Sequence, residues 1–344
     1  MTATIEIDKK MKWLGDVGAS HVLSLMLLAL QGEIKGLYRH AVKGLSADSM
    51  DKVYVGTSET FPDDRRFALL KTEKTVTFSP EQPEWIHKEN FLCSFSDPQL
   101  MAQYRAQYSL QVKKISSEIS SSVDSYGVPC DEVIMVPAAA DDDDDTPSKK
   151  ILELYERSTD QLVLGPLDLS TPQGQSELAD FFSKQSGTPL TCVSADTGTT
   201  DNSNSQHKHQ FGNTGSGWKQ RKDTRTLHIV NAATVRQLSE RIDVPLNPTR
   251  FRPNIVLDGP APWSEFDWVG KTLLFGSTKL KVISTTVRCD AVTVDPMDHP
   301  DLVVLDIPKL LVEHFPEHGP YLGVYAVVEE GGAMAIGNDV VLLE

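Results

Sequence analysis

Short runs of alternating apolar and polar residues predict a protein built mainly from β-strands. Gly, Pro, Ser and Asp separate these runs, as is typical of strands joined by turns. The runs lie at residues 34–38, 52–55, 66–70, 75–78, 151–155, 161–164, 226–230, 255–257, 279–287, 321–332 and 339–343. The pair at 151–155 and 161–164 predicts a hairpin around residues 157–160.

A few segments have the three- and four-residue spacing of helices. The first is expected to begin after Asp97, with a core face formed by Leu100, Met101, Tyr104 and Tyr108. A second is expected after Ser170 or Thr171, where a hydroxyl side chain followed by Pro172 suits a helix start. Shorter helices are expected at 234–242 and 307–315.

These elements predict an α+β, strand-rich fold with two modules and short helices. Residues 1–30 are an N-terminal extension, residues 31–187 form a β-rich module, and residues 188–344 form a second strand-rich domain. Two polar loops are expected, at about 114–149 within the first module and at about 194–224 within the second. A chain of 344 residues is long enough for this division.

The charge balance disfavours two classes of partner. The formal net charge of −15 argues against nucleic acid and against anionic membrane surfaces. Part of the charge lies in the acidic run at 141–145, which is typical of a solvated loop.

The cysteines and the N-terminal segment bear on the compartment. Four cysteines lie far apart, so neither a local zinc or iron–sulfur motif nor a disulfide scaffold is indicated, and a reducing, cytoplasmic location is expected. The apolar run at 22–30 is shorter than the roughly 20 residues that span a bilayer. We interpret it as an amphipathic or buried helix, with organellar targeting by the extension as the alternative.

Candidate chemistry gathers between residues 250 and 296. Arg250 and Arg252 are two residues apart, and on an extended segment they would project to the same side. Cys289 directly follows Arg288, and a neighbouring cation favours the thiolate, which is the form that attacks or binds metal. A lone cysteine at a strand end is, however, usually a small buried hydrophobe. His207 and His209 lie in a polar loop, where such a pair is more often incidental than a metal site.

Four phrases in this part of the chain resemble the MOSC domain. They are Arg-Phe-Arg-Pro-Asn at 250–254, Trp-Ser-Glu-Phe-Asp-Trp-Val-Gly at 263–270, Arg-Cys-Asp-Ala-Val-Thr-Val-Asp-Pro at 288–296, and Leu-Gly-Val-Tyr at 322–325. The domain occurs in molybdenum cofactor sulfurases and in amidoxime-reducing proteins. Further upstream, residues 37–45 and 64–67 resemble the opening of the family's N-terminal β-barrel domain. The resemblance therefore implies a β-barrel-like module at residues 31–187 and a MOSC-type β-barrel domain at residues 188–344.

The resemblance implies a molybdenum cofactor (Mo-molybdopterin) and assigns candidate roles. Cys289 would be the protein ligand of molybdenum or would carry a persulfide, and Asp295 would brace the cysteine loop more than transfer protons. The candidate cofactor-binding residues are Lys43, Arg65, Asn231, Thr234, Arg250, Arg252 and Asn254. Arginine suits a phosphate because its planar group of donors cannot lose its charge. Asn231 and Thr234 stand at a strand-to-helix junction, where a plain helix cap explains them nearly as well.

The resemblance favours a molybdenum-dependent oxidoreductase that reduces N-hydroxylated or N-oxide-type small molecules. The chain contains no flavin, haem or iron–sulfur motif, so electrons would come from a separate reductase. The alternatives are a sulfur carrier that receives a persulfide on Cys289 from a cysteine desulfurase, and a non-catalytic binding module. The chain has no room for the pyridoxal phosphate domain of the sulfurases. Ala291 and Val292 depart from the family pattern next to Cys289 and put substrate preference in doubt.

Overall fold

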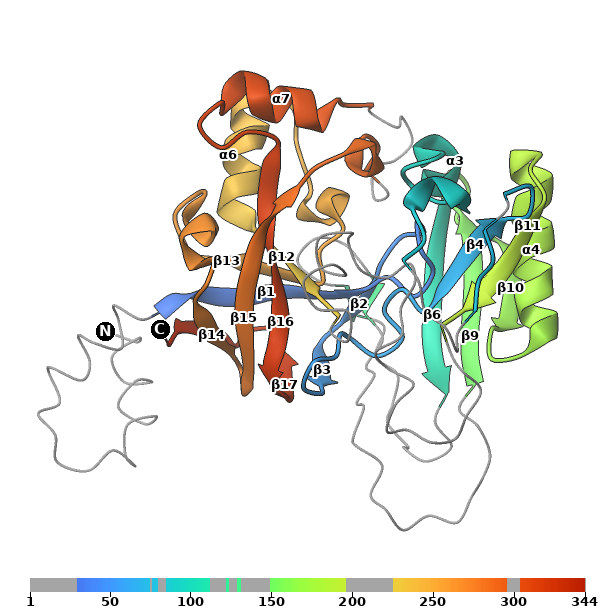
Figure 1. Ribbon diagram of the computed structural model, residues 1–344, viewed down its shortest axis with the longest axis horizontal. Helices are drawn as coiled ribbons and strands as arrows, with labels where there is room; N and C mark the ends of the chain where they lie inside the picture. Colours follow the sequence, from blue (N-terminus) through green and yellow to red (C-terminus); the bar gives the residue numbers. More distant parts are fainter. Residues whose placement is uncertain are drawn as a thin grey trace, which may run out of the picture.

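The computed structural model shows two lobes side by side (Figure 1), the larger formed mainly by the C-terminal half of the chain. We call the larger one the barrel lobe and the smaller one the second lobe. The structure describes residues 30–74, 76–79, 85–111, 122–123, 129–130, 149–195, 225–295 and 304–343. Within these ranges no helix has both the length and the apolar character needed to cross a bilayer.

Seven strands close the barrel, in the order β13-β12-β16-β15-β14-β18-β1, with β1 pairing back to β13. Their bounds are Leu30–Arg39 (β1), Leu227–Asn231 (β12), Ile255–Asp258 (β13), Thr272–Phe275 (β14), Thr278–Val287 (β15), Tyr321–Glu330 (β16) and Asp339–Leu342 (β18). Only β12 and β13 pair in parallel among these strands, because the connection between them passes through a helix. Alternate strand residues such as Phe275 and Leu280 point inward and form the barrel core, which Trp268 joins from the connection before β14.

Short strands extend the barrel towards the second lobe. β1 runs across the barrel and continues towards that lobe (Figure 1), where β2 pairs with its far end. The additional strands are β2 (Asp48–Met50), β8 (Pro129–Cys130) and β7 (Ser122–Val123), and a separate pair joins β17 (Gly332–Ala335) to β3 (Lys52–Val55).

Helices cover one end of the barrel. α6 (Ala232–Ile242) begins at Asn231, whose side chain accepts a hydrogen bond from the Ala233 N–H, and it ends at Asp243 in the left-handed conformation. α7 (Ile307–His314) packs beside it over a second apolar cluster. Three 3₁₀ helices lie in the connecting loops: η2 (Pro248–Phe251), η3 (Ser264–Trp268) and η4 (Asp290–Val292).

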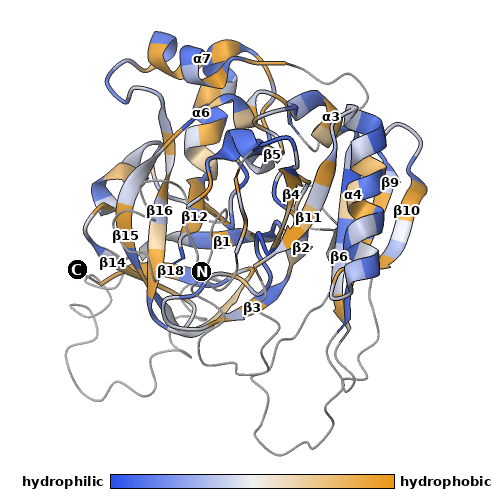
Figure 2. Cartoon of the chain, turned by 45° about the vertical axis from the view of Figure 1, so that its right-hand side comes forward, coloured by the Kyte–Doolittle hydropathy of each residue, from blue (hydrophilic) through white to orange (hydrophobic). Residues whose placement is uncertain are grey.

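The second lobe contains two three-stranded sheets. One has the order β10-β9-β6 and the other β11-β4-β5. The strands are β4 (Phe67–Lys71), β5 (Phe91–Leu92), β6 (Tyr104–Gln111), β9 (Lys149–Glu156), β10 (Gln161–Asp168) and β11 (Leu190–Ser194), and the helices are η1 (Lys88–Asn90), α3 (Pro98–Ala102) and α4 (Pro172–Ser186). Hydrophobic and polar residues alternate around α4 (Figure 2), and its buried residues Leu178, Ala179 and Phe182 join the core of this lobe.

The strand-rich α+β prediction, with a barrel and short helices, is confirmed. The hairpin is β9–β10, and α4 starts at Thr171, which accepts a hydrogen bond from the Gly174 N–H. The division of the chain at residue 187 stays a prediction. Strand pairing crosses it in both directions, because β1 pairs with β13 and β18, and β11 pairs with β4.

Three local predictions were wrong. Tyr104 and Tyr108 lie on β6 and not on a helix, because a spacing of four residues suits one face of a strand as well as one face of a helix. Residues 76–79 form no strand. Arg250 and Arg252 do not lie on an extended segment, since Arg250 belongs to η2 and Arg252 follows it in the left-handed conformation.

Several predicted features lie outside the described residues. These are the N-terminal helix (apart from Leu30, which begins β1), the acidic run, the His207 and His209 pair, and most of the two polar loops.

Candidate functional site

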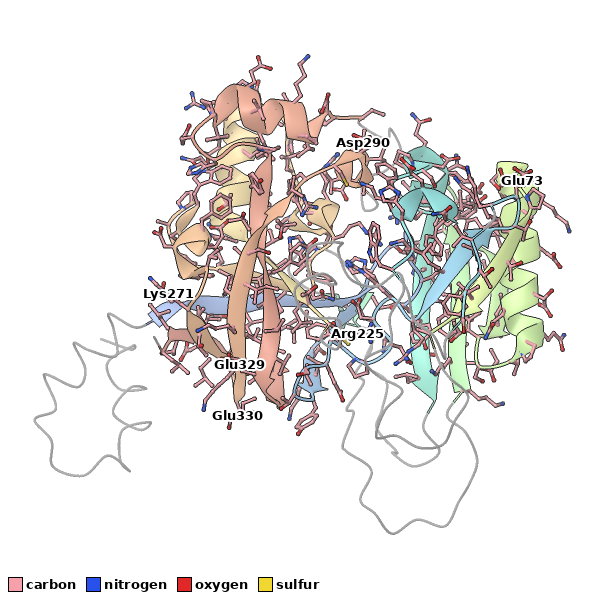
Figure 3. All side chains as sticks on the ribbon, in the orientation of Figure 1. Glu73, Arg225, Lys271, Asp290, Glu329 and Glu330 are labelled. Carbon is pink, nitrogen blue, oxygen red and sulfur yellow. The ribbon has the colours of Figure 1, made fainter. Side chains whose placement is uncertain are left out.

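A cavity of about 300 Å³ brings together residues from both lobes. The barrel lobe contributes the start of β12, the end of β15 and the middle of β16, together with η2 and η4. The second lobe contributes residues 85–88 and 93–95. Lys43 and Gly44, after β1, and Arg65, before β4, complete the described lining. η4 contacts α3 across the two lobes, and Asp290 of η4 faces the second lobe in Figure 3, whereas Glu329 and Glu330 lie at the opposite end of the barrel.

The described lining is strongly cationic although the whole chain is acidic. It contains five permanent or readily formed cations, Lys43, Arg65, Lys88, Arg252 and Arg288, and no carboxylate. Burial lowers the pKa of Lys43 to about 8; Cys93 opposes this change, and repulsion from Arg65, Arg252 and Lys88 adds to it. Burial and the charge of Arg65 likewise lower the pKa of Arg252. An anion in the cavity would relieve this repulsion, so the site is suited to an anionic ligand.

Two of the arginines are held in an unfavourable backbone conformation. Arg65 has φ 52° and Arg252 has φ 54°, in the left-handed region that non-glycine residues seldom occupy. Hydrogen bonds hold both residues there, from the Arg65 N–H to the His40 carbonyl at 2.7 Å and from the Arg252 N–H to the Thr249 carbonyl at 2.9 Å. Such strain costs about 1–3 kcal/mol per residue and tends to occur where a side chain must be aimed at a ligand.

Gly44 allows the two lobes to approach closely beside the cavity. Its φ of +96° favours glycine, and an added Cβ would lie 2.5 Å from the Cys93 Cα atom. The Gly44 carbonyl accepts hydrogen bonds from Ser94 Oγ at 2.6 Å and from Arg252 Nη1 at 3.4 Å. One backbone group therefore connects the second-lobe wall to the barrel wall.

Arg288, the residue before Cys289, interacts with His228. Arg288 Nη2 donates to the Phe251 carbonyl at 2.9 Å, and Nη1 lies 3.3 Å from His228 Nε2. His228 Nδ1 lies 3.3 Å from the Arg252 carbonyl. A carbonyl can only accept and a guanidinium can only donate, so the imidazole is neutral, with its proton on Nδ1. Burial and the charge of Arg288 lower the pKa of His228, which agrees with this assignment.

Cys289 lines the cavity at the start of η4 and is partly exposed. The loop that follows is held by Arg250, whose Nη1 donates to the carbonyls of Val292 at 3.2 Å and Thr293 at 2.9 Å. Arg250 Nε lies 3.8 Å from an Asp295 carboxylate oxygen, and both side chains are buried. Arg250 and Asp295 are absent from the described lining, so their position suits support of the cysteine loop.

Three other predicted residues also lie away from the cavity. Asn231 Nδ2 and Thr234 Oγ1 both donate to the buried carboxyl of Glu265, at 3.0 Å and 2.8 Å. Burial raises the pKa of Glu265 to about 7, although these hydrogen bonds oppose the rise. Asn254 joins β12 to β1, because its side chain accepts from the His228 N–H and donates to the Tyr38 carbonyl. The structure therefore places Lys43, Arg65, Arg252 and Cys289 in the cavity, and Asn231, Thr234, Arg250, Asn254 and Asp295 outside its described lining.

Sequence reasoning missed several cavity residues. Cys93 and His228 lie among buried apolar residues, and their types alone gave no signal. Tyr325 belongs to the Leu-Gly-Val-Tyr phrase but was given no role. Trp85 and Lys88 belong to a Trp-x-x-Lys phrase that could have indicated the second-lobe wall. Arg288 was noted only as the neighbour of Cys289.

The described residues offer isolated thiols to a metal rather than a chelating set. Across the described ranges, no group of three or more His, Cys, Asp or Glu side chains could hold an ion. The donor set fits a metal that arrives with ligands and anionic groups of its own, bound by one soft thiolate and a ring of cations.

Comparisons with known proteins agree with this geometry. A family model described as the MOSC domain matches residues 206–341. Mitochondrial amidoxime-reducing component 1 of Homo sapiens is 31% identical over 131 residues, which cover 35% of this chain and 38% of that protein. Mitochondrial amidoxime reducing component 2 of Rattus norvegicus is 28% identical over 130 residues, covering 34% of this chain and 37% of that protein.

Each match therefore spans little more than a third of the curated relative. Among solved structures, the YuaD protein from Bacillus subtilis aligns over 90% of this chain and 94% of that chain, with 10% identity and a TM-score of 0.33. The matched region contains Cys289, Arg252 and Arg288, which the structure gathers at one cavity. The chain contains a MOSC domain at residues 206–341, and about a third of it is similar to amidoxime-reducing components.

Proposed function

We propose that this protein binds a molybdenum cofactor and reduces N-hydroxylated or N-oxide-type small molecules with electrons from a separate reductase. The observation that carries the proposal is the opening of the Cys289 thiol into a cavity whose described lining holds five cations and no carboxylate. The relationship to amidoxime-reducing components supports the reaction class.

The chain's own residues would divide the binding of the cofactor between them. Lys43, Arg65 and Arg252 would hold its phosphate, because all three line the cavity and the described lining contains no carboxylate. The thiolate of Cys289 would be the protein ligand of the metal. Arg250 and Asp295 would keep the cysteine loop in place from behind. When bound, the cofactor supplies the two-electron redox chemistry.

The remaining lining residues would receive the substrate. Trp85, Phe95 and Val287 give the cavity apolar surface beside its cations, and Val287 is 57% exposed. Apolar walls with a few directed polar groups are typical of small-molecule sites.

The test is the molybdenum content of protein produced in a host that loads a known molybdoenzyme. We expect about one molybdenum per chain in the wild type and a marked loss in Cys289→Ala. Cys192→Ala is the matched control, because Cys192 is buried in the core of the second lobe and does not line the cavity. It should retain its metal.

Wild-type protein without molybdenum in such a host would refute the proposal. A persulfide on Cys289, found by mass spectrometry in that metal-free protein, would then favour a sulfur carrier.

A further inference from the structure

Reduction of an N–OH group needs protons, and the described cavity lining contains few groups that could supply one. Two electrons and two protons convert an N–OH group into N–H and water. The described lining has no Asp or Glu. Its neutral or weakly acidic donors are therefore limited to the two histidines, Lys43, the thiols and Tyr325.

Both histidines already interact with other groups of the protein. Both ring nitrogens of His228 are engaged, Nδ1 by the Arg252 carbonyl and Nε2 by Arg288. His87 Nδ1 accepts the Glu89 N–H at 3.4 Å and lies 3.5 Å from the Glu89 carboxylate, and the His87 side chain is 43% exposed. His87 is therefore in contact with solvent and with Glu89.

Lys43 and Tyr325 lie in different parts of the cavity wall. Lys43 Nζ lies 5.6 Å from the ring centroid of Phe91, a residue of β5 in the second lobe. Tyr325 pairs with Ser284 of β15, the strand that leads to Cys289. Lys43 thus lies towards the second-lobe wall, and Tyr325 lies on the Cys289 side.

The barrel strands fix the position of Tyr325. It lies opposite His228 in the pairing of β12 with β16, and the two rings are 5.3 Å apart, centroid to centroid. His228 is in turn 3.3 Å from Arg288 Nη1. Gly323 makes this arrangement possible, since a Cβ there would lie 2.8 Å from His228 Nε2.

Arg288 can still donate a hydrogen bond to a ligand. It is only 9% exposed, and its Nε is buried without a hydrogen-bond partner among the described residues. An unpaired buried donor in a cavity wall is costly unless a ligand pairs with it. The Tyr325 hydroxyl likewise has no hydrogen bond to the described residues, and its ring lines the same cavity.

We propose that Tyr325 is the catalytic proton donor of the cavity and that Arg288, positioned by His228, stabilises the phenolate that remains. This rests on the proposed function. As the N–O bond breaks, the external reductant has supplied two electrons, and the Tyr325 O–H proton passes to the departing oxygen, which leaves as water. The nitrogen takes the second proton from solvent, and solvent then reprotonates the Tyr325 oxygen.

The test is Tyr325→Phe, which removes only the hydroxyl. Tyr321→Phe is the matched control, because Tyr321 lies on the same strand, is 37% exposed and does not line the cavity. Each protein is loaded with molybdenum, its metal content is measured, it is reduced with dithionite and then mixed with an N-hydroxylated substrate. Reduction by dithionite and reoxidation by substrate are followed separately.

We expect Tyr325→Phe to keep its molybdenum and its rate of reduction by dithionite. Its reoxidation by substrate should slow by about 100-fold or more, as is usual when a general acid is removed. The solvent deuterium isotope effect on that step should also change. Tyr321→Phe should match the wild type in every measurement.

The outcomes separate this inference from the proposed function. If loaded wild-type protein turns over and Tyr325→Phe reoxidises within about threefold of it, Tyr325 is not the donor and only this inference fails. Loss of molybdenum from Tyr325→Phe would assign the hydroxyl to cofactor binding and would also overturn it. If wild-type protein takes up no molybdenum, both proposals fall.

Discussion

Glu265 allows the buried polar cluster at the start of α6 to be tested apart from the cavity. Its side chain is 0% exposed and accepts hydrogen bonds from Asn231 and Thr234. Burial raises its pKa from 4.5 to about 7. The folded protein therefore binds this proton more tightly than the unfolded chain, so stability is highest below pH 4.5 and falls as the pH rises to about 7.

The size of the effect follows from the two pKa values. A shift from 4.5 to about 7 corresponds to about 3 kcal/mol, at about 1.4 kcal/mol per pKa unit. Glu265→Gln cannot ionise but still offers a carbonyl oxygen to Asn231 and Thr234. We expect the variant to match the wild type in free energy of unfolding near pH 4.5 and to exceed it by up to about 3 kcal/mol above pH 7.

The assay is guanidinium unfolding of both proteins between pH 4.5 and pH 8. The result is the difference between their free energies of unfolding at each pH. The difference matters because buried His40 and His228, whose pKa values are lowered by burial, change stability in the opposite sense below about pH 6.5. Glu313→Gln, at an exposed position on α7, should show no such pH dependence. Equal pH profiles for the wild type and Glu265→Gln would refute the reasoning.

Three further predictions concern the cavity and its supports. Lys43→Ala should weaken the binding of inorganic pyrophosphate to the cofactor-free protein by about tenfold in calorimetry, since it removes a half-buried cation from the described lining, whereas exposed Lys52→Ala should not. Gly323→Ala should lower the free energy of unfolding by at least about 2 kcal/mol more than Gly270→Ala does. Both glycines have positive φ, but an added Cβ would lie 2.6 Å from the Ile229 carbonyl oxygen at Gly323 and would meet nothing within 4 Å at Gly270. Arg250→Leu should cost about 3–5 kcal/mol in denaturant unfolding, because it leaves the buried Asp295 carboxylate without its ion pair, and a loss below about 1 kcal/mol would contradict this role.

The strands were predictable from the sequence because period-two alternation survives in most of them. The pattern could not separate a strand from a helix at Tyr104 and Tyr108, where a four-residue spacing fits both. It also misplaced Arg252, because a left-handed conformation in a non-glycine residue leaves no mark on composition. Which strands close the barrel depends on pairings between distant segments, such as β1 with β13 and β18.

The candidate site was predictable only in part. Family phrases indicated Lys43, Arg65, Arg252 and Cys289, which the structure brings to one cavity from four separate segments. The same phrases could not show that Asn231 and Thr234 bind Glu265, because that carboxyl comes from a loop about thirty residues away. His228 could not be identified, since a polar side chain on a buried strand is recognised as a cavity residue only once the neighbouring strands are in place, and the Leu-Gly-Val-Tyr phrase gave no role for Tyr325.

The most direct test of the central claim is X-ray absorption at the molybdenum edge, on the wild type and on Cys289→Ala loaded with cofactor in the same host. If the Cys289 thiolate binds the metal, the wild-type spectrum will require one more sulfur neighbour than the variant spectrum. Residual molybdenum in the variant would then be coordinated only by the cofactor's own sulfurs and by oxygen. Equal sulfur coordination in the two proteins would contradict the assignment of Cys289 as the ligand.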